Sequence, residues 1–142
     1  MKFMVIVKAS AASEAGAMPA TELLEAMGRF NEEMVKAGVL TAGEGLHASA
    51  RGARIEFDGA GRHIVRGPFP DTEHLVAGFW IIDVASLEDA IGWMKRCPNP
   101  HPDQGRTHLE IRQIIGMEDF GETMTPELRE QEERLRSQTA DA

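Results

Sequence analysis

Residues 77–84, AGFWIIDV, are the stretch that decides the fold. Its aromatic and β-branched side chains favour a strand. Because successive side chains of a strand point to opposite faces, this one presents apolar groups on both sides. A second apolar run, FMVIV at residues 3–7, stands between two lysines. The sequence therefore predicts two strands that need a cover on both of their faces.

Two stretches with helical periodicity accompany these strands. The first begins near Pro19 and ends at Gly38, a typical residue just past a helix end. Its apolar side chains recur at steps of three and four: Leu23, Met27, Phe30, Met34 and Ala37. The second begins at Ser86 with a capping-box pattern and ends before Pro98. Its apolar side chains are Leu87, Ala90, Ile91 and Met94. Each stripe predicts a helix packed on a sheet.

The remaining strands complete an α+β pattern. Residues 39–46 and 107–115 predict two strands, and residues 54–57 and 63–66 predict a hairpin around DGAG. The order strand, helix, strand, hairpin, strand, helix, strand is a ferredoxin-like βαββαβ plan with an inserted hairpin. We assign this domain to residues 1–120.

Residues 121–142 form a C-terminal helical tail in this prediction. Thr125 and Pro126 are suited to the start of a helix that runs to residue 137. Its apolar anchors are Leu128 and Leu135. A helix with so narrow an apolar stripe is expected to lie against something else, such as a partner subunit.

The predicted sheet leaves one face without helices. Both faces of its central strands are apolar, so this face needs a second cover. In a chain of 142 residues, another copy of the same sheet is the simplest cover. The sequence therefore predicts a homodimer that assembles sheet to sheet.

Composition limits the partners. The net charge of −8 disfavours nucleic acid and anionic membrane surfaces. The single cysteine, Cys97, excludes an internal disulfide, and the N-terminus lacks the pattern of a signal peptide, so we expect a cytoplasmic protein. The five histidines show no spacing typical of metal ligands, and we expect neither a metal nor a cofactor.

Several motifs together resemble one protein family. RGPFPDT at residues 66–72, AGFWIIDV, RCPNPHP at residues 96–102 and LEIRQI at residues 109–114 resemble the DGPF group of the YCII-related family, and the tail MTPELREQEERL fits one of its branches. The resemblance implies a small dimeric α+β barrel protein that binds or transforms a small molecule. Some relatives are fused to or encoded beside transcription initiation factors, which implies an alternative role as a non-enzymatic interaction or regulatory module.

In the turn at residues 67–70, GPFP, glycine permits unusual backbone dihedrals and each proline fixes φ, so a rigid turn is expected. It is either a plain structural turn or a support that holds Arg66 and Asp71 at the mouth of a cleft. Arg66 stands where the family motif has Asp, and a fixed cation cannot act as a general base. Asp71 keeps an acid where the family usually has Glu.

A row of polar side chains lies along one face of the last predicted strand. His108, Glu110 and Arg112 alternate with apolar residues and so share one face. The row either faces solvent or lines a cavity inside the dimer, where it would bind an anionic ligand or move a proton.

Two further residues are catalytic candidates beside Asp71. His101 stands between two prolines, with Asp103 near enough in sequence to orient its ring. Glu44 stands between two glycines that either admit a ligand or form a bulge. We expect a small polar ligand, anionic or neutral, in a cleft between the first helix, the hairpin and the sheet. His101 would carry the proton, and Arg66 or Arg112 would hold the charge.

Overall fold

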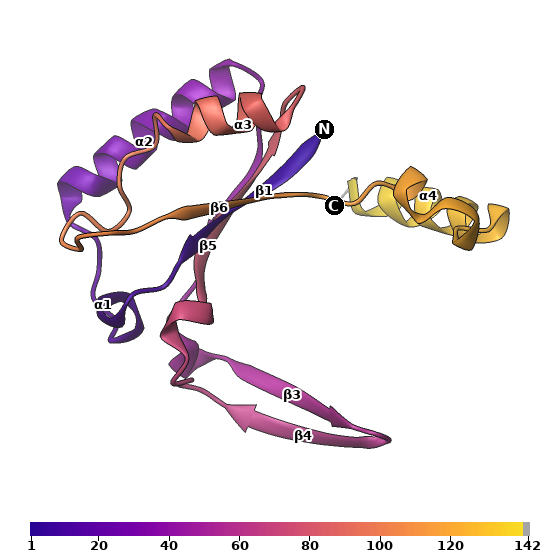
Figure 1. The fold of residues 1–142 in the computed structure, drawn as a ribbon, viewed down its shortest axis with the longest axis horizontal. Helices are drawn as coiled ribbons and strands as arrows, with labels where there is room; N and C mark the ends of the chain where they lie inside the picture. Colours follow the sequence, from indigo (N-terminus) through magenta and orange to yellow (C-terminus); the bar gives the residue numbers. More distant parts are fainter. Residues whose placement is uncertain (141–142) are drawn as a thin grey trace.

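The computed structural model describes residues 1–140, and a four-stranded antiparallel sheet forms its centre (Figure 1). The strands are β1 (Lys2–Lys8), β2 (Leu40–Gly45), β5 (Val76–Asp83) and β6 (Leu109–Gln113). Their order across the sheet is β2-β5-β1-β6. Together with α2 (Thr21–Lys36) and α3 (Leu87–Met94), this order is that of the ferredoxin-like fold. The predicted α+β class and βαββαβ plan are confirmed.

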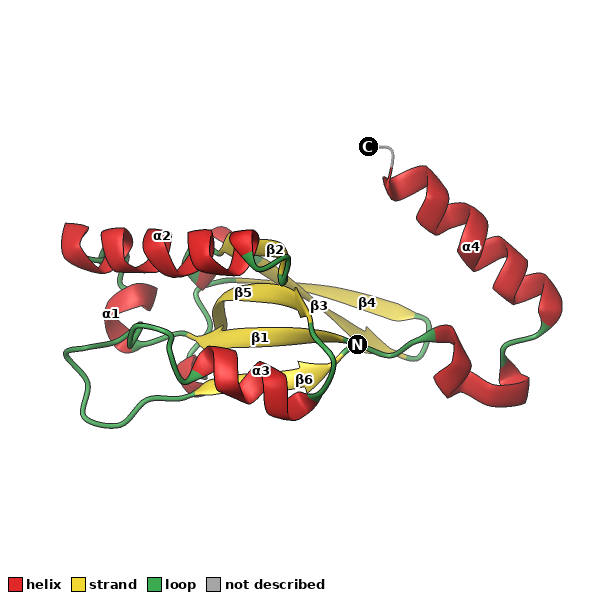
Figure 2. Ribbon diagram, turned by 90° about the horizontal axis from the view of Figure 1, so that it is seen from above, coloured by secondary structure: helices red, strands yellow, loops and turns green. Residues whose placement is uncertain are grey.

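Helices α2 and α3 cover one face of the sheet (Figure 2). The core beneath them consists of Phe3, Val5, Phe30, Met34, Val39, Trp80, Ile82, Ala90 and Met94. Trp80 packs edge-on against Phe30, with 5.9 Å between ring centroids, and its Nε1–H donates to Asn31 Oδ1 at 2.9 Å. Gly43 admits this indole, since a Cβ there would lie 2.9 Å from Trp80 Cδ1. Within the described residues, no helix lies over the other face of the sheet, which we call the open face.

The inserted hairpin is a separate two-stranded sheet of β3 (Ala53–Asp58) and β4 (Gly61–Arg66). Ile55 pairs with Ile64 in its ladder. The hairpin projects from the sheet on the side away from α2 and α3 (Figure 1). It is therefore an arm rather than part of the main sheet.

Two predicted boundaries were wrong. The loop expected at residues 9–17 contains a helical turn, α1 (Ala11–Glu14). Ser10 and Ser13 cap it reciprocally: the N–H of each donates to the hydroxyl of the other. The last strand is shorter than the predicted residues 107–115, since β6 spans Leu109–Gln113. The Thr107 hydroxyl, before the strand, donates to Asn99 Oδ1.

The C-terminal helix α4 (Pro126–Ala140) follows a 3-10 segment, η3 (Met117–Thr123), and both lie apart from the sheet. Thr125 caps α4, with its hydroxyl accepting from the Leu128 N–H at 3.2 Å. Residues 141–142 of the predicted tail lie outside the described residues. Within residues 1–140, the helices lack the combination of length and apolar character that a membrane span requires.

Candidate functional site

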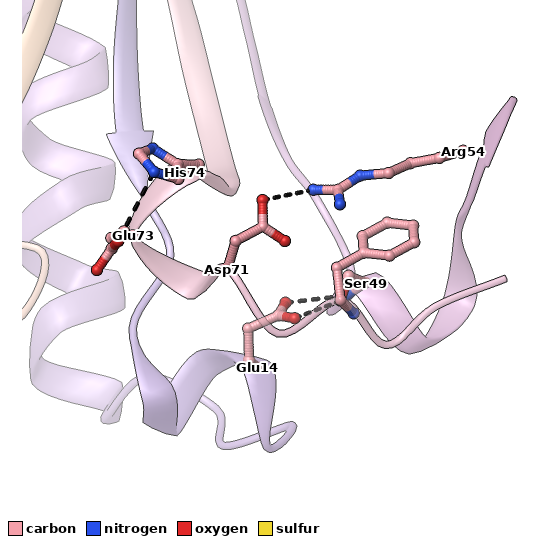
Figure 3. Close-up of polar contacts among 7 residues, drawn as sticks. Glu14, Ser49, Arg54, Asp71, Glu73 and His74 are labelled. Atoms are coloured by element: carbon pink, nitrogen blue, oxygen red, sulfur yellow. Dashed lines mark hydrogen bonds and ion pairs between the residues drawn. The ribbon is translucent and has the colours of Figure 1, made fainter. Parts of the chain in front are cut away.

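Two contacts with Ser49 hold the GPFP turn in place, one at Gly67 and one at Phe69. A Cβ on Gly67 would lie 1.7 Å from the Ser49 carbonyl oxygen, so only glycine fits there. The Phe69 N–H donates to Ser49 Oγ at 2.9 Å. Ser49 in turn donates to the Glu14 carboxylate through both its hydroxyl and its N–H, the latter at 2.9 Å (Figure 3). The helical turn α1 and the 3-10 segment η1 (Ser49–Arg51) thus fix the turn in place.

Asp71, at the end of this turn, pairs with Arg54 of β3 (Figure 3). Arg54 Nη2 lies 2.8 Å from Asp71 Oδ2, and the guanidinium carbon lies 4.0 Å from the Phe69 ring centroid. The hydrogen bond from Arg54 holds the pKa of Asp71 below its usual value, and a backbone hydrogen bond adds to the effect. The same pair raises the pKa of Arg54. Asp71 is therefore a firmly ionised acceptor.

The second oxygen of this carboxylate, Asp71 Oδ1, is buried and has no hydrogen-bond partner among residues 1–140. Buried polar atoms are nearly always hydrogen-bonded, so an unpartnered one calls for a physical explanation. This oxygen has almost no exposed surface, so a bound molecule could donate a hydrogen bond to it only after neighbouring side chains shift.

The arginine that pairs with Asp71 is Arg54 rather than Arg66. Arg66 lies opposite Ala53 in the hairpin ladder, whereas Arg54 lies opposite Val65. Because opposed residues share a face and successive residues alternate, Arg66 and Arg54 occupy opposite faces of the hairpin. Arg54, which the motif did not single out, takes the place beside Asp71.

His101 is oriented by the backbone of β1. Its Nε2 lies 2.7 Å from the Lys8 carbonyl oxygen, and since a carbonyl only accepts, Nε2 carries the proton. The loop around it is held by Asn99 Oδ1, which accepts from the His101 N–H at 2.9 Å and from the Thr107 hydroxyl at 3.0 Å. The ring is thus oriented by Lys8 rather than by Asp103, and its Nδ1 is the nitrogen left to exchange a proton.

The other candidates lie on the open face of the sheet. Strand register places Glu44, Phe79, Ile6 and Glu110 in one row across β2, β5, β1 and β6. The next row consists of Ala42, Ile81, Met4 and Arg112. An apolar centre is therefore flanked by Glu44 on one side and by Glu110 and Arg112 on the other. Arg112 Nη1 lies 3.4 Å from Glu110 Oε2, and His108 is exposed just before β6 begins.

The candidates fall into two groups rather than one. Asp71 and His101 both lie at the end of the sheet where β1 finishes, since Lys8 pairs with Val76 and η2 (Thr72–His74) leads into β5. Arg112 lies opposite Met4, about 13 Å along β1 from Lys8. Arg66, His101 and Arg112 therefore do not meet in a single chain.

One groove of the structure lies away from these candidate residues. An open groove of about 570 Å³ occupies the other end of the sheet, between the end of α2, the end of β5 and α3. Trp93 and Arg96 are part of its lining, but none of the candidate residues is. This groove is distinct from the predicted cleft between the first helix, the hairpin and the sheet. Burial raises the pKa of the Cys97 thiol to about 11, so this cysteine stays protonated at neutral pH.

Comparison with known proteins places the chain in a family. The model of the YCII-related domain matches residues 1–117. An uncharacterised protein of Rhizobium meliloti (strain 1021) is 29% identical over 80 residues, which are 56% of this chain. The match spans 63% of that relative, less than two thirds of its length.

Among solved structures, the chain resembles 5-chloro-2-hydroxyhydroquinone dehydrochlorinase (TftG) from Burkholderia phenoliruptrix AC1100, in complex with 2,5-dihydroxybenzoquinone. The TM-score is 0.42 and the sequence identity 13%, over 81% of this chain and 94% of that one. The family match covers most of the sequence, and the strand order agrees with the fold that the sequence motifs implied. The protein belongs to the YCII-related domain family.

Proposed function

We propose that the protein is a cytoplasmic homodimer, assembled through the open face of its sheet, and that it binds a small polar molecule beside Asp71 and His101. The observation that carries the proposed site is the buried, unpartnered Oδ1 of Asp71. Leaving such an oxygen without a donor is unfavourable, and a hydroxyl or amine hydrogen of a ligand would satisfy it.

The two residues would have different roles. Asp71, kept ionised by Arg54, would accept a hydrogen bond and so fix the position of the ligand. His101, held by the Lys8 carbonyl, would exchange a proton through Nδ1. The low pKa of Asp71 makes it a better anchor than base.

The dimer is supported by the apolar centre of the open face. Met4, Ile6, Phe79 and Ile81 are only partly buried in the single chain. Full burial of a large apolar side chain is worth roughly 1.5–3 kcal/mol, so a partner sheet over this centre would be strongly favoured. Glu44, Glu110 and Arg112 would then line the interface between the two sheets.

A thermal-shift screen tests the binding site. The panel pairs small hydroxylated compounds with their carboxylate-bearing analogues. A compound present at a hundredfold excess over its dissociation constant should stabilise the fold by about 2.7 kcal/mol. Asp71→Asn should abolish the shift, because the amide presents a donor where the ligand needs an acceptor. Glu73→Gln, at the exposed neighbouring acid, is the matched control and should keep it.

The remaining variants separate the roles. His101→Ala should leave part of the binding intact and remove proton transfer. Arg112→Ala should leave the shift unchanged, because Arg112 lies opposite Met4, about 13 Å along β1 from Lys8. The proposed site is excluded if Asp71→Asn binds the same compounds as the wild type, or if no compound shifts the wild type. The interaction-module alternative would then be the better account.

A further inference from the structure

The two faces of the hairpin differ sharply in character. Strand register places Ala53, Ile55, Phe57, Arg62, Ile64 and Arg66 on one face. Three of these are large apolar residues with most of their surface exposed: Ile55 at 56%, Phe57 at 72% and Ile64 at 65%. The charged residues of this face are both arginines. We call it the apolar face of the hairpin.

This face lacks the cover that such a surface normally has. A lone two-stranded hairpin is marginally stable in water, and a contiguous exposed apolar patch marks an interaction site. The Arg62 guanidinium, 4.5 Å from the centroid of the Phe57 ring, shields one edge of the patch. The opposite face carries Arg54, Glu56, Asp58 and His63, a mixture suited to solvent.

The C-terminal segment, residues 117–140, has complementary properties. Its exposed apolar residues are Phe120, Leu128 and Leu135, each at 46–49% exposure. Leu128 and Leu135 are seven residues apart and therefore share one side of α4. The segment carries seven acidic and three basic residues, so it is strongly acidic where the apolar face of the hairpin is basic.

The two arms are placed to meet across a dimer rather than within one chain. Both extend from the sheet away from α2 and α3, and they remain apart from each other in both views (Figures 1 and 2). A second copy seated on the open face would lie between them. The strands of the hairpin reach about 20 Å and α4 about 22 Å, so the two surfaces match in length.

We propose that the apolar face of the hairpin of one protomer packs against the C-terminal segment of its partner, with Arg62 and Arg66 facing the acidic residues of that segment. Two-fold symmetry would create this contact twice. The inference rests on the proposed homodimer and adds to it a second, separate contact surface.

A double-mutant cycle on the full-length chain tests the contact. The hairpin variant is Phe57→Ala, and the tail variant combines Leu128→Ala with Leu135→Ala. Phe57 is largely exposed and the two leucines are nearly half exposed in the single chain, so folding should survive, and circular dichroism checks that it does. Each variant should raise the dimer dissociation constant in sedimentation equilibrium at least tenfold, since each removes two symmetric contacts. His63→Ala, on the opposite face of the hairpin, is the control and should leave the constant unchanged.

The combined variant decides whether the two surfaces touch. If they do, joining both changes should raise the dissociation constant by clearly less than the product of the separate effects. A full product, or no effect of Phe57→Ala, would overturn the contact while leaving the sheet-to-sheet dimer in place. A monomeric wild type would overturn the dimer itself and this inference with it.

Discussion

The central strands β1 and β5 are apolar on both faces of the sheet, yet residues 1–140 cover only one of these faces. Along β5, Trp80 and Ile82 are buried beneath α2 and α3, at 8% and 0% exposure. Their neighbours Phe79 and Ile81 point to the open face and are only partly buried. The contrast teaches that hydropathy shows which faces must be covered, while the order of the elements decides whether the chain supplies the cover itself.

The largest effect should come from a charge placed on the covered face. Trp80→Glu would remove the hydrogen bond to Asn31 and the packing on Phe30. Burying an unpaired carboxylate costs several kcal/mol or forces it to take up a proton. We expect a protein that fails to fold cooperatively, as seen in its thermal melt by circular dichroism. An unchanged melting temperature would show that this face is not the core.

The same charge one residue earlier should act differently. Phe79→Glu places the carboxylate on the open face, where the single chain leaves it access to water. We expect a folded monomer, observed as a native circular dichroism spectrum together with half the mass of the wild type. A Phe79→Glu protein that remains a dimer would show that this face is not the interface.

A second contrast concerns two glycines near the GPFP turn. A Cβ on Gly67 would overlap the Ser49 carbonyl, whereas one on Gly52 would lie at an ordinary 3.5 Å from it. Gly67→Ala should therefore destabilise the fold by about 1–3 kcal/mol, and Gly52→Ala much less. Urea denaturation of the two variants gives the comparison, and equal midpoints would contradict the clamped turn.

Lowering the pH should reduce the stability of the fold, because protonation of Asp71 weakens its pair with Arg54. Because its pKa is lower in the folded state, the pair with Arg54 stabilises the fold fully above the unfolded pKa, near 3.8. This stabilisation is lost as the pH falls through the lower folded pKa. Asp71→Asn should reduce stability at pH 6 and make it less sensitive to acid between pH 4 and pH 2. Denaturation curves at these pH values, with Glu73→Gln as control, measure the difference.

The smallest effect on stability should come from the ion pair on the open face. Glu110 and Arg112 lie 3.4 Å apart, and the Arg112 side chain is 72% exposed. Such pairs contribute about 0–1 kcal/mol to folding. Arg112→Ala should therefore leave the denaturation midpoint of the Phe79→Glu monomer nearly unchanged. A large loss of stability would mean that Arg112 has a structural role.

Sequence periodicity predicted the architecture well because burial follows side-chain alternation. The strands around Val5 and Trp80 and the helices around Met34 and Ala90 all form where their apolar patterns indicate. The site was harder to predict. Arg54 reaches Asp71 only because the hairpin folds back, and nothing in the spacing of these residues points to their pairing. His101 is oriented by the carbonyl of Lys8. Because every residue has a backbone carbonyl, the residue types in the sequence do not show which one accepts this hydrogen bond.

The mass of the wild-type protein in solution tests the account most directly. The open face predicts a stable dimer of twice the 15.6 kDa of one chain, measured by light scattering at micromolar concentration. The proposed contacts of the sheet and of the hairpin both depend on that result. A folded, stable species of 15.6 kDa under the same conditions would contradict the account.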